Sequence, residues 1–319
     1  MNVQNGIAIA IAWPEFVGKQ TGTWYDKPMT FLGFNKNFHY RVGHASLVLI
    51  SKDDGNCKYF DCGRYHAPYQ YGRIRDESSD SVLSIQTKAN WEKDRIENIQ
   101  EILQEIQRNP WSFGMGPLAA SYCEINYDRA LEKVKRMQSN GIIPFGPFTL
   151  NGTNCCRFVR SGILAGSPKL SGVKQVLLNY FWHLKPMPIT NVDLLKNKLV
   201  IFSENQETNH GKYHSTGAYT WETVHGTLPE PSRPENIPMD SQWLAGEVSG
   251  SWFHLQKEGS QFRISRYSPE GFEECTGIFS CISDHTFNPE APFEFTYLSH
   301  CSHVSLIQAG KMLEFQRVQ

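Results

Sequence analysis

The segment Thr149-Leu-Asn-Gly-Thr-Asn-Cys-Cys-Arg-Phe-Val-Arg-Ser-Gly162 decides how the first part of this chain is interpreted. It passes from an extended stretch through a glycine turn into a predicted helix, for which Thr153 or Asn154 is a suitable N-cap. A cysteine in the first turn of that helix faces free backbone N–H groups and the positive end of the helix dipole. Both favour a thiolate, so the segment predicts a reactive cysteine. The alternative is that Cys155 and Cys156 are small core residues.

A nucleophilic cysteine needs a base, and His44 is the histidine placed best for that role. It opens an apolar strand predicted over residues 44–50, directly after Gly43, and a strand holds a side chain rigidly. A purely structural histidine is the alternative. His210 and His214 lack the cysteine or carboxylate spacing of a metal site. The sequence therefore indicates no metal and no cofactor.

The strand after His44 carries a polar residue that could complete a catalytic triad. Residues 53–56, Asp-Asp-Gly-Asn, form a good hairpin connection, so we expect strands 44–50 and 57–62 to pair antiparallel. Alternation along the second strand places Tyr59 and Asp61 on one face.

Asp61 has more than one possible role. It could hold the His44 imidazole in the required tautomer, as the acid of a Cys-His-acid arrangement does. It could equally cap the turn at Gly63 or pair with Arg64. The catalytic role requires a strand register that brings Asp61 to His44, and the sequence does not fix that register.

Together these residues resemble the permuted NlpC/P60 (papain-like) hydrolases, a superfamily that includes lecithin:retinol acyltransferase and related amidases. In that superfamily the histidine precedes the cysteine, and the nucleophile opens a helix of the type Asn-Cys-x-x-Phe-Val, here residues 154–159. The resemblance implies a nucleophile at Cys155 and a general base at His44. It places the third polar residue at Asp61, with Tyr59 as the next match.

A stretch that follows the second strand is rich in aromatic and basic side chains and could receive an anionic or peptide-like ligand. Its members are Tyr65, His66, Tyr69, Tyr71, Arg73 and Arg75. We select Tyr65 and Arg73, together with Tyr59 and Cys156, as candidate substrate-binding residues. The alternative is a solvated loop with packed tyrosines. Residues 111–117 could likewise be a lid with glycine hinges or an irregular connection.

A proline-rich segment divides the chain. Residues 228–238 contain four prolines, which neither continue a helix nor pair inside a sheet. We therefore predict two domains, residues 1–227 and 239–319. The first is predicted to be an α+β, permuted papain-like domain with its strands largely before its helices. Its predicted strands are 6–13, 29–34, 44–50 and 58–61, and its predicted helices are 91–108, 128–138 and 154–166.

The second predicted domain is all-β. Short alternating runs separated by turn residues occur between residues 243 and 318, as in 261–267 and 303–307. Six or seven strands at this spacing predict a small antiparallel barrel or sandwich, loosely similar to lipocalin-like barrels.

Composition and the absence of sorting signals limit the partners. Lys plus Arg is 31 and Asp plus Glu is 32, so no global basic field draws the chain to nucleic acid. No stretch approaches the roughly 20 apolar residues of a spanning helix, and no signal peptide is evident. Eight cysteines without a CxxC pair predict no disulfide scaffold. We therefore expect a cytoplasmic protein with no integral membrane segment.

These features predict a cysteine peptidase or amidase that cleaves a peptide-like amide bond, such as one in a cell-wall peptide, through a thioester. An acyltransferase that acts on an ester is less favoured, because that branch of the superfamily usually has a membrane-associating segment. The rival hypothesis is a non-catalytic binding protein built on a degenerate hydrolase fold.

Overall fold

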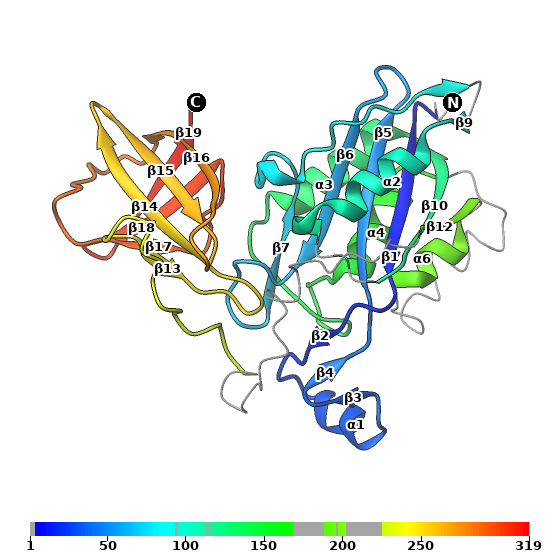
Figure 1. Ribbon diagram of the computed structural model, residues 1–319, viewed down its shortest axis with the longest axis horizontal. Helices are drawn as coiled ribbons and strands as arrows, with labels where there is room; N and C mark the ends of the chain where they lie inside the picture. Colours follow the sequence, from blue (N-terminus) through cyan, green and yellow to red (C-terminus); the bar gives the residue numbers. More distant parts are fainter. Residues whose placement is uncertain are drawn as a thin grey trace.

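The computed structural model describes residues 4–92, 95–112, 114, 116–168, 188–195, 197–201 and 225–318. Figure 1 shows a mixed α/β part formed by the chain up to residue 201, here the N-terminal part, beside a separate antiparallel sheet formed after residue 240, here the C-terminal part. No helix among these residues is long and apolar enough to span a bilayer.

The N-terminal part is built on a seven-stranded antiparallel sheet in the order β11-β7-β6-β5-β1-β10-β12. Its strands are β1 (Gly6–Trp13), β5 (His44–Ser51), β6 (Cys57–Gly63), β7 (Tyr71–Arg75), β10 (Leu118–Ile125), β11 (Ile143–Pro144) and β12 (Asn197–Ile201). The central strands are buried on both faces, which explains their nearly continuous apolar sequence.

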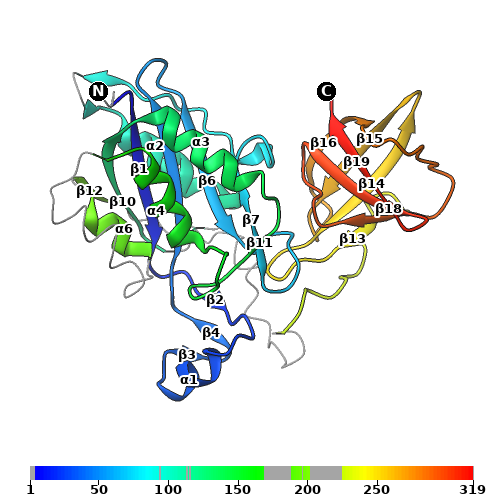
Figure 2. The same cartoon turned by 180° about the vertical axis from the view of Figure 1, so that it is seen from behind.

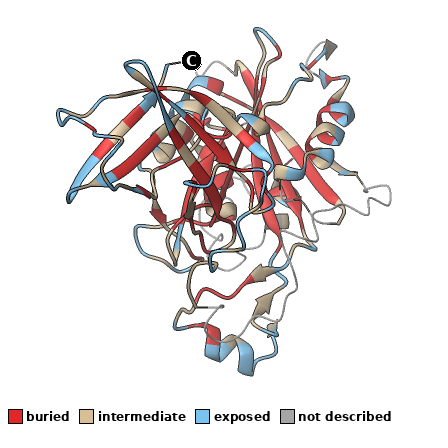
Figure 3. Ribbon diagram, turned by 60° about the vertical axis from the view of Figure 1, so that its left-hand side comes forward, coloured by how far each residue is buried: buried red, intermediate tan, exposed pale blue. Residues whose placement is uncertain are grey.

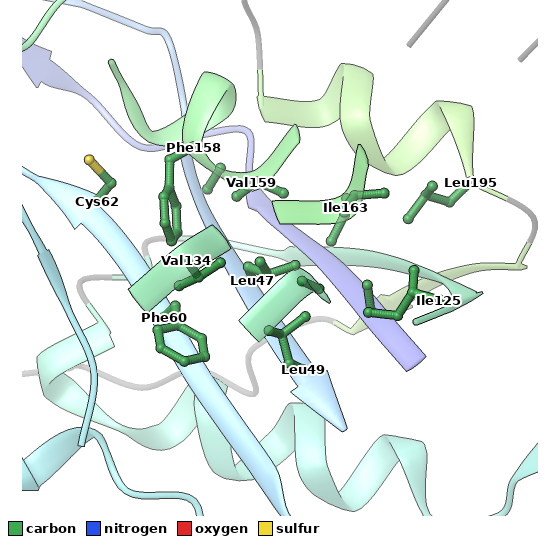
Figure 4. Packing of buried hydrophobic residues seen from close by; sticks show 14 of the residues in the cluster. Leu47, Leu49, Phe60, Cys62, Ile125, Val134, Phe158, Val159, Ile163 and Leu195 are labelled. Atoms are coloured by element: carbon green, nitrogen blue, oxygen red, sulfur yellow. The ribbon is translucent and has the colours of Figure 1, made fainter. Parts of the chain in front are cut away.

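The sequence of β1, Gly-Ile-Ala-Ile-Ala-Ile-Ala-Trp, separates the two faces of the sheet. Its isoleucines and Trp13 pack in a cluster with α2 (Ile99–Arg108). Its alanines pack on the opposite face with α3 (Tyr127–Gln138), α4 (Cys155–Ala165) and α6 (Pro188–Leu194). Small side chains let these helices approach the sheet closely. Figure 2 shows the face with α3, α4 and α6, and Figure 4 shows its core, including Leu47, Phe60, Val134 and Phe158.

Several predicted elements are confirmed. The strands at 6–13, 44–50 and 58–61 are β1, β5 and β6, and the hairpin between the last two pairs antiparallel. The predicted helices 128–138 and 154–166 correspond to α3 and α4.

Other predictions are wrong. Residues 29–34 do not form a strand, because Pro28 lies in the first turn of a short helix, α1 (Asp26–Phe31), which Gly33 ends at a φ of +76°. The predicted helix 91–108 begins only at Ile99, and its first part forms β8 (Trp91–Glu92) and β9 (Arg95–Ile96).

The predicted order, with strands largely before helices, holds for β1, β5, β6 and β7 but fails for the later strands of the sheet. The central strand β10 follows α2 and pairs with β1. Its sequence, Leu-Ala-Ala-Ser-Tyr-Cys-Glu-Ile, alternates poorly, because most of its residues are buried on both faces.

The C-terminal part is a nearly closed, barrel-like antiparallel sheet of seven strands in the order β13-β14-β15-β16-β19-β18-β17, which confirms the predicted all-β character. Its strands are β13 (Gln242–Leu244), β14 (Ser251–Glu258), β15 (Gln261–Tyr267), β16 (Glu273–Cys281), β17 (Glu294–Thr296), β18 (His303–Gln308) and β19 (Lys311–Arg317). Phenylalanines dominate its core. Cys275 and Cys301 form a disulfide, although the cysteine count alone predicts no disulfide scaffold.

The proline-rich segment 228–238 contains no helix or strand, as its composition predicts. The exact domain boundaries, 1–227 and 239–319, stay a prediction.

Buried polar contacts join the C-terminal part to the strands that carry the candidate site. Asp80 lies 2.9 Å from both Arg73 of β7 and Arg266 of β15, and all three side chains are buried. Arg266 also lies 2.6 Å from Glu274. Arg64 pairs with Glu247, so the alternative in which Asp61 pairs with Arg64 is not the arrangement observed. The C-terminal part thus contacts β7 through paired charges.

Candidate active site

Cys155 is the first residue of α4, as the sequence predicts, and the N-cap is Asn154 rather than Thr153. The Asn154 side-chain oxygen accepts a hydrogen bond from the backbone N–H of Arg157 at 2.8 Å, and its carbonyl accepts one from Phe158 at 2.9 Å. The cap therefore fixes the start of the helix at the cysteine. Cys155 is half-buried, whereas its neighbour Cys156 is buried.

His44 is the first residue of β5 and is only 4% exposed. Gly43, with a φ of +76°, turns the chain into the strand. The imidazole stacks on Trp13, with ring centroids 5.7 Å apart, and contacts Phe16 at 5.4 Å. These aromatic rings hold the imidazole in one orientation and exclude water from it.

His44 reaches both the candidate nucleophile and the candidate acid. Burial by itself would lower its pKa, but hydrogen bonds with Asp61 and the Cys155 thiol, and their charges, raise the pKa to about 9. The His44 Nε2 atom lies 3.9 Å from Asp61 Oδ2. The structure thus brings the three predicted catalytic residues together at the end of β5 where the N-terminus of α4 meets the sheet.

The register of the β5–β6 hairpin accounts for the position of Asp61. Asp61 lies opposite Ser46, which is two residues from His44 and therefore on the same face of β5. Tyr59 shares that face and donates a hydrogen bond to Asp61 at 3.4 Å, whereas Phe60 points into the other core cluster. The alternation predicted for this strand is confirmed.

Arg75 is the main partner of Asp61. The two residues face each other across β6 and β7, and Arg75 binds both carboxylate oxygens, with Nε at 3.0 Å and Nη2 at 2.5 Å. Burial would raise the pKa of Asp61, but the charge of Arg75 and the contact with His44 outweigh burial and lower it. Asp61 is therefore an anion although it is completely buried.

Tyr65 contributes to the same cluster from the segment after β6. Its hydroxyl lies 3.2 Å from His44 Nε2, and the Arg75 guanidinium lies 3.8 Å from the centre of its ring. Gly63 makes this packing possible, because a Cβ atom there would lie 2.2 Å from the Tyr65 ring. Tyr65 is 3% exposed, so its placement favours orienting His44 over contact with a ligand.

The other three candidate substrate-binding residues are also buried. Tyr59 packs in the core cluster beneath α2. Arg73 donates to both oxygens of Asp80 at 2.9 Å. Burial raises the pKa of Cys156 to about 12, and Asn191 donates to its carbonyl at 3.0 Å. These placements favour structural roles, and contact of these residues with a ligand stays a prediction.

The aromatic and basic stretch after β6 is not a solvated loop. Tyr71 to Arg75 form strand β7, and both arginines are buried in ion pairs. The segment 111–117 begins in a short 3-10 helix, Pro110–Ser112, and its residues 113 and 115 lie outside the described residues. His210 and His214 also lie outside them.

Two residues that orient the site were not identified from the sequence. Arg75 was noted only as part of the basic stretch, although a buried carboxylate on β6 calls for a cation on the paired strand. Trp13 ends β1 directly opposite His44. The sequence signal for Trp13 is its position at the end of an apolar strand, because a strand that pairs with β5 places its last residue beside the first residue of β5.

The comparisons with known proteins place the chain in a family. The family model described as type VI secretion system effector TseH-like matches residues 8–171, more than half of the chain and the part that holds Cys155, His44 and Asp61. The chain therefore belongs to the family of TseH-like type VI secretion system effectors. Residues 241–318 match the model described as DUF6695 C-terminal domain.

One solved structure, titled the crystal structure of the type VI secretion system effector TseH, is also similar. It has 14% sequence identity and a TM-score of 0.36, and the match covers 62% of this chain and 98% of that one. Among curated proteins no match was found.

Proposed function

We propose that this TseH-like effector is a cysteine hydrolase with a permuted papain-like domain, and that it cleaves an amide bond in a peptide-like substrate such as a cell-wall peptide. The observation that carries the proposal is the position of His44, which contacts the Cys155 thiol on one side and lies 3.9 Å from Asp61 on the other. Nucleophile, base and orienting acid in this order are the arrangement that thiol-dependent acyl transfer requires.

The proposed reaction has two steps. His44, as the imidazolium, holds the proton that the Cys155 thiol has given up, and the thiolate attacks the carbonyl carbon of the amide. Backbone N–H groups in the first turn of α4 stabilise the oxyanion, and His44 then protonates the departing amine, which leaves a thioester. In the second step His44 takes a proton from water and the hydroxide attacks the thioester carbonyl carbon. The bond from that carbon to the Cys155 sulfur then breaks, the carboxylic acid product leaves, and the proton stays with the regenerated Cys155–His44 pair.

The three residues around the imidazole have separate tasks in this scheme. Because Nε2 of His44 faces Tyr65 and Asp61, Nδ1 is the nitrogen left to exchange a proton with Cys155. Asp61 stabilises the imidazolium, and Arg75 keeps Asp61 ionised. The buried Cys156 thiol, with its raised pKa, is not the nucleophile.

The proposal is tested by incubating the full chain with a panel of cell-wall peptide fragments and of simple acyl esters, and by detecting products by mass spectrometry. We expect cleavage at an amide bond, trapping of the thioester on Cys155, and loss of both with Cys155→Ala. Cleavage of the esters alone would favour the acyltransferase alternative. If neither substrate class reacts and Cys155 resists a thiol-directed probe, the protein is a binding module on a hydrolase fold.

A further inference from the structure

A small module stands out from the N-terminal part. It occupies residues 18–40, between β1 and β5, and combines α1 with a three-stranded sheet of β2 (Gly18–Lys19), β4 (His39–Tyr40) and β3 (Asn35–Lys36). Figures 1 and 2 show it from opposite sides, extending beyond the seven-stranded sheet. We call this module the tip.

Four large apolar side chains of the tip face outward, although Tyr25 is buried. Trp24 is 76% exposed and Phe31 is 91% exposed, and Leu32 and Phe34 are 62% and 64% exposed. Figure 3 shows α1 as a largely exposed element at the end of the molecule. Phe148, from the loop before α4, is partly exposed and extends this surface through a ring contact with Trp24 at 6.1 Å. Large apolar side chains gathered in this way mark an interaction surface.

The interior of the tip is polar instead. The buried Asp26 carboxylate accepts hydrogen bonds from the backbone of Thr23 at 2.9 Å and from the Tyr40 hydroxyl at 2.6 Å. Thr30 donates to the Asp26 carbonyl at 2.7 Å, and Asn35 donates to Thr30 at 2.8 Å. Hydrogen bonds therefore hold the tip together. Phe31, Leu32 and Phe34 are mostly exposed and contribute little to this interior, so they are available to another surface.

The exposed charges of the tip determine which surface fits. The exposed charged side chains within residues 23–40 are Lys27 and Lys36, whereas the single acidic residue, Asp26, is buried in the hydrogen-bonded interior. A convex element with exposed Trp, Phe and Leu side chains beside lysines matches an anionic lipid surface, where the rings enter the interface and the ammonium groups meet phosphates. Protein interfaces, in contrast, are depleted in lysine.

We propose that the tip docks this protein peripherally on a bilayer that contains anionic phospholipid. The tip leads directly into β5, which His44 opens, and Phe148 precedes Cys155 by only seven residues. Docking through the tip therefore holds the catalytic end of the sheet toward the membrane. This inference does not depend on the proposed hydrolysis, because it concerns a surface outside the triad.

The test is co-sedimentation of the full chain with vesicles of phosphatidylglycerol and phosphatidylcholine, compared with vesicles of phosphatidylcholine alone. We expect binding to the anionic vesicles that weakens with added salt. The double variant Phe31→Ser/Leu32→Ser should lower the partition coefficient at least ~10-fold, because two inserted apolar side chains are lost. Lys27→Glu/Lys36→Glu should lower it by ~20-fold or more, since each lysine contributes a factor of about 5.

Matched controls use exposed residues of the C-terminal part. Phe272→Ser, at a side chain that is 68% exposed, and Lys257→Glu/Lys311→Glu should bind like the parent chain. Cys155→Ala should also bind normally, so loss of hydrolysis and loss of docking are distinguishable. Circular dichroism checks that each variant is folded.

Three results would overturn the proposal. The first is no binding to anionic vesicles, and the second is equal binding by the tip variants and their controls. The third is self-association of the parent chain in light scattering that Phe31→Ser/Leu32→Ser removes without a change in vesicle binding, which would make the tip a contact between copies or with a protein partner.

Discussion

Arg75 and Asp61 form a two-point ion pair in the interior of the sheet, with neither side chain more than 2% exposed. Asp61 also lies 3.9 Å from the His44 imidazole, so it stands between Arg75 and His44. A fixed, ionised carboxylate beside the imidazole stabilises the imidazolium form, so Arg75 influences the proposed chemistry without touching the substrate. It is a positioning residue.

Arg75→Met should destabilise the fold and lower turnover. The substitution leaves the Asp61 carboxylate buried without its main partner, which costs about 3–5 kcal/mol of unfolding free energy. Urea denaturation measures that loss, and Arg75→Met/Asp61→Asn should recover part of it because the unpaired charge is gone. Arg263→Met breaks an exposed pair with Glu258 and should cost less than ~1 kcal/mol. An equal effect of both single substitutions would contradict a buried-pair role.

The two adjacent cysteines should differ sharply in reactivity. Iodoacetamide near neutral pH should label Cys155, which is half-buried and contacts His44, and should leave Cys156 unmodified because that thiol is buried with a pKa of about 12. Peptide mapping by mass spectrometry distinguishes the two sites. His44→Gln should slow the labelling of Cys155 by at least ~10-fold. Preferential labelling of Cys156 would reverse the assignment of the nucleophile.

Because the pKa of His44 is raised in the folded chain, the free energy of unfolding should decrease as the pH rises on the alkaline side. Its pKa rises from an ordinary 6.5 to about 9 in the folded chain, so the folded state binds this proton more tightly than the unfolded state. The stabilisation is complete below about pH 6.5 and is lost as the pH rises through about 9. It amounts to a few kcal/mol, on the order of 3. Denaturation of the parent chain and of His44→Gln across this range measures it.

The same ionisation should limit activity. kcat/KM for the proposed hydrolysis should fall as the pH rises through about 9, where the imidazolium loses its proton and the leaving group can no longer be protonated. Tyr65→Phe removes the hydroxyl next to Nε2 of His44 and should shift the pH at which kcat/KM falls, while the fold is retained. If neither Tyr65→Phe nor Asp61→Asn changes the pH at which kcat/KM falls on the alkaline side, a group other than His44 controls that fall.

Asp80 should couple the C-terminal part to the candidate site. Asp80→Asn leaves the buried Arg73 and Arg266 without their shared anion. Burial would raise the pKa of Asp80, but the two arginines hold that pKa well below its usual range. We expect a loss of about 3–5 kcal/mol in unfolding free energy. In a double-mutant cycle with Arg266→Met the two effects should be strongly non-additive. Asp240→Asn is the matched control and should change little, because the Asp240 carboxylate, which pairs with His254, is itself exposed.

Local patterns in the sequence were sufficient for much of the site. Asn154 caps the helix that Cys155 opens because capping depends on neighbours within four residues. Alternation along β6 placed Tyr59 and Asp61 together because a strand has a period of two. The turns and alternating runs after residue 240 indicated the C-terminal sheet for the same reason. Where local signals were weak, as at α1 and β10, the prediction was wrong or absent.

By itself, the sequence determined which residues have the chemistry for this site and which elements carry them. Only the tertiary structure decided that they meet. The register that sets Asp61 opposite Ser46 and the pairing of Arg75 with Asp61 depend on contacts between consecutive strands. The contact of Cys155, at the N-terminus of α4, with His44 joins segments far apart in the chain. Such contacts are selected by the packing of the whole sheet and its two cores, because a slip of one residue would turn every side chain to the opposite face.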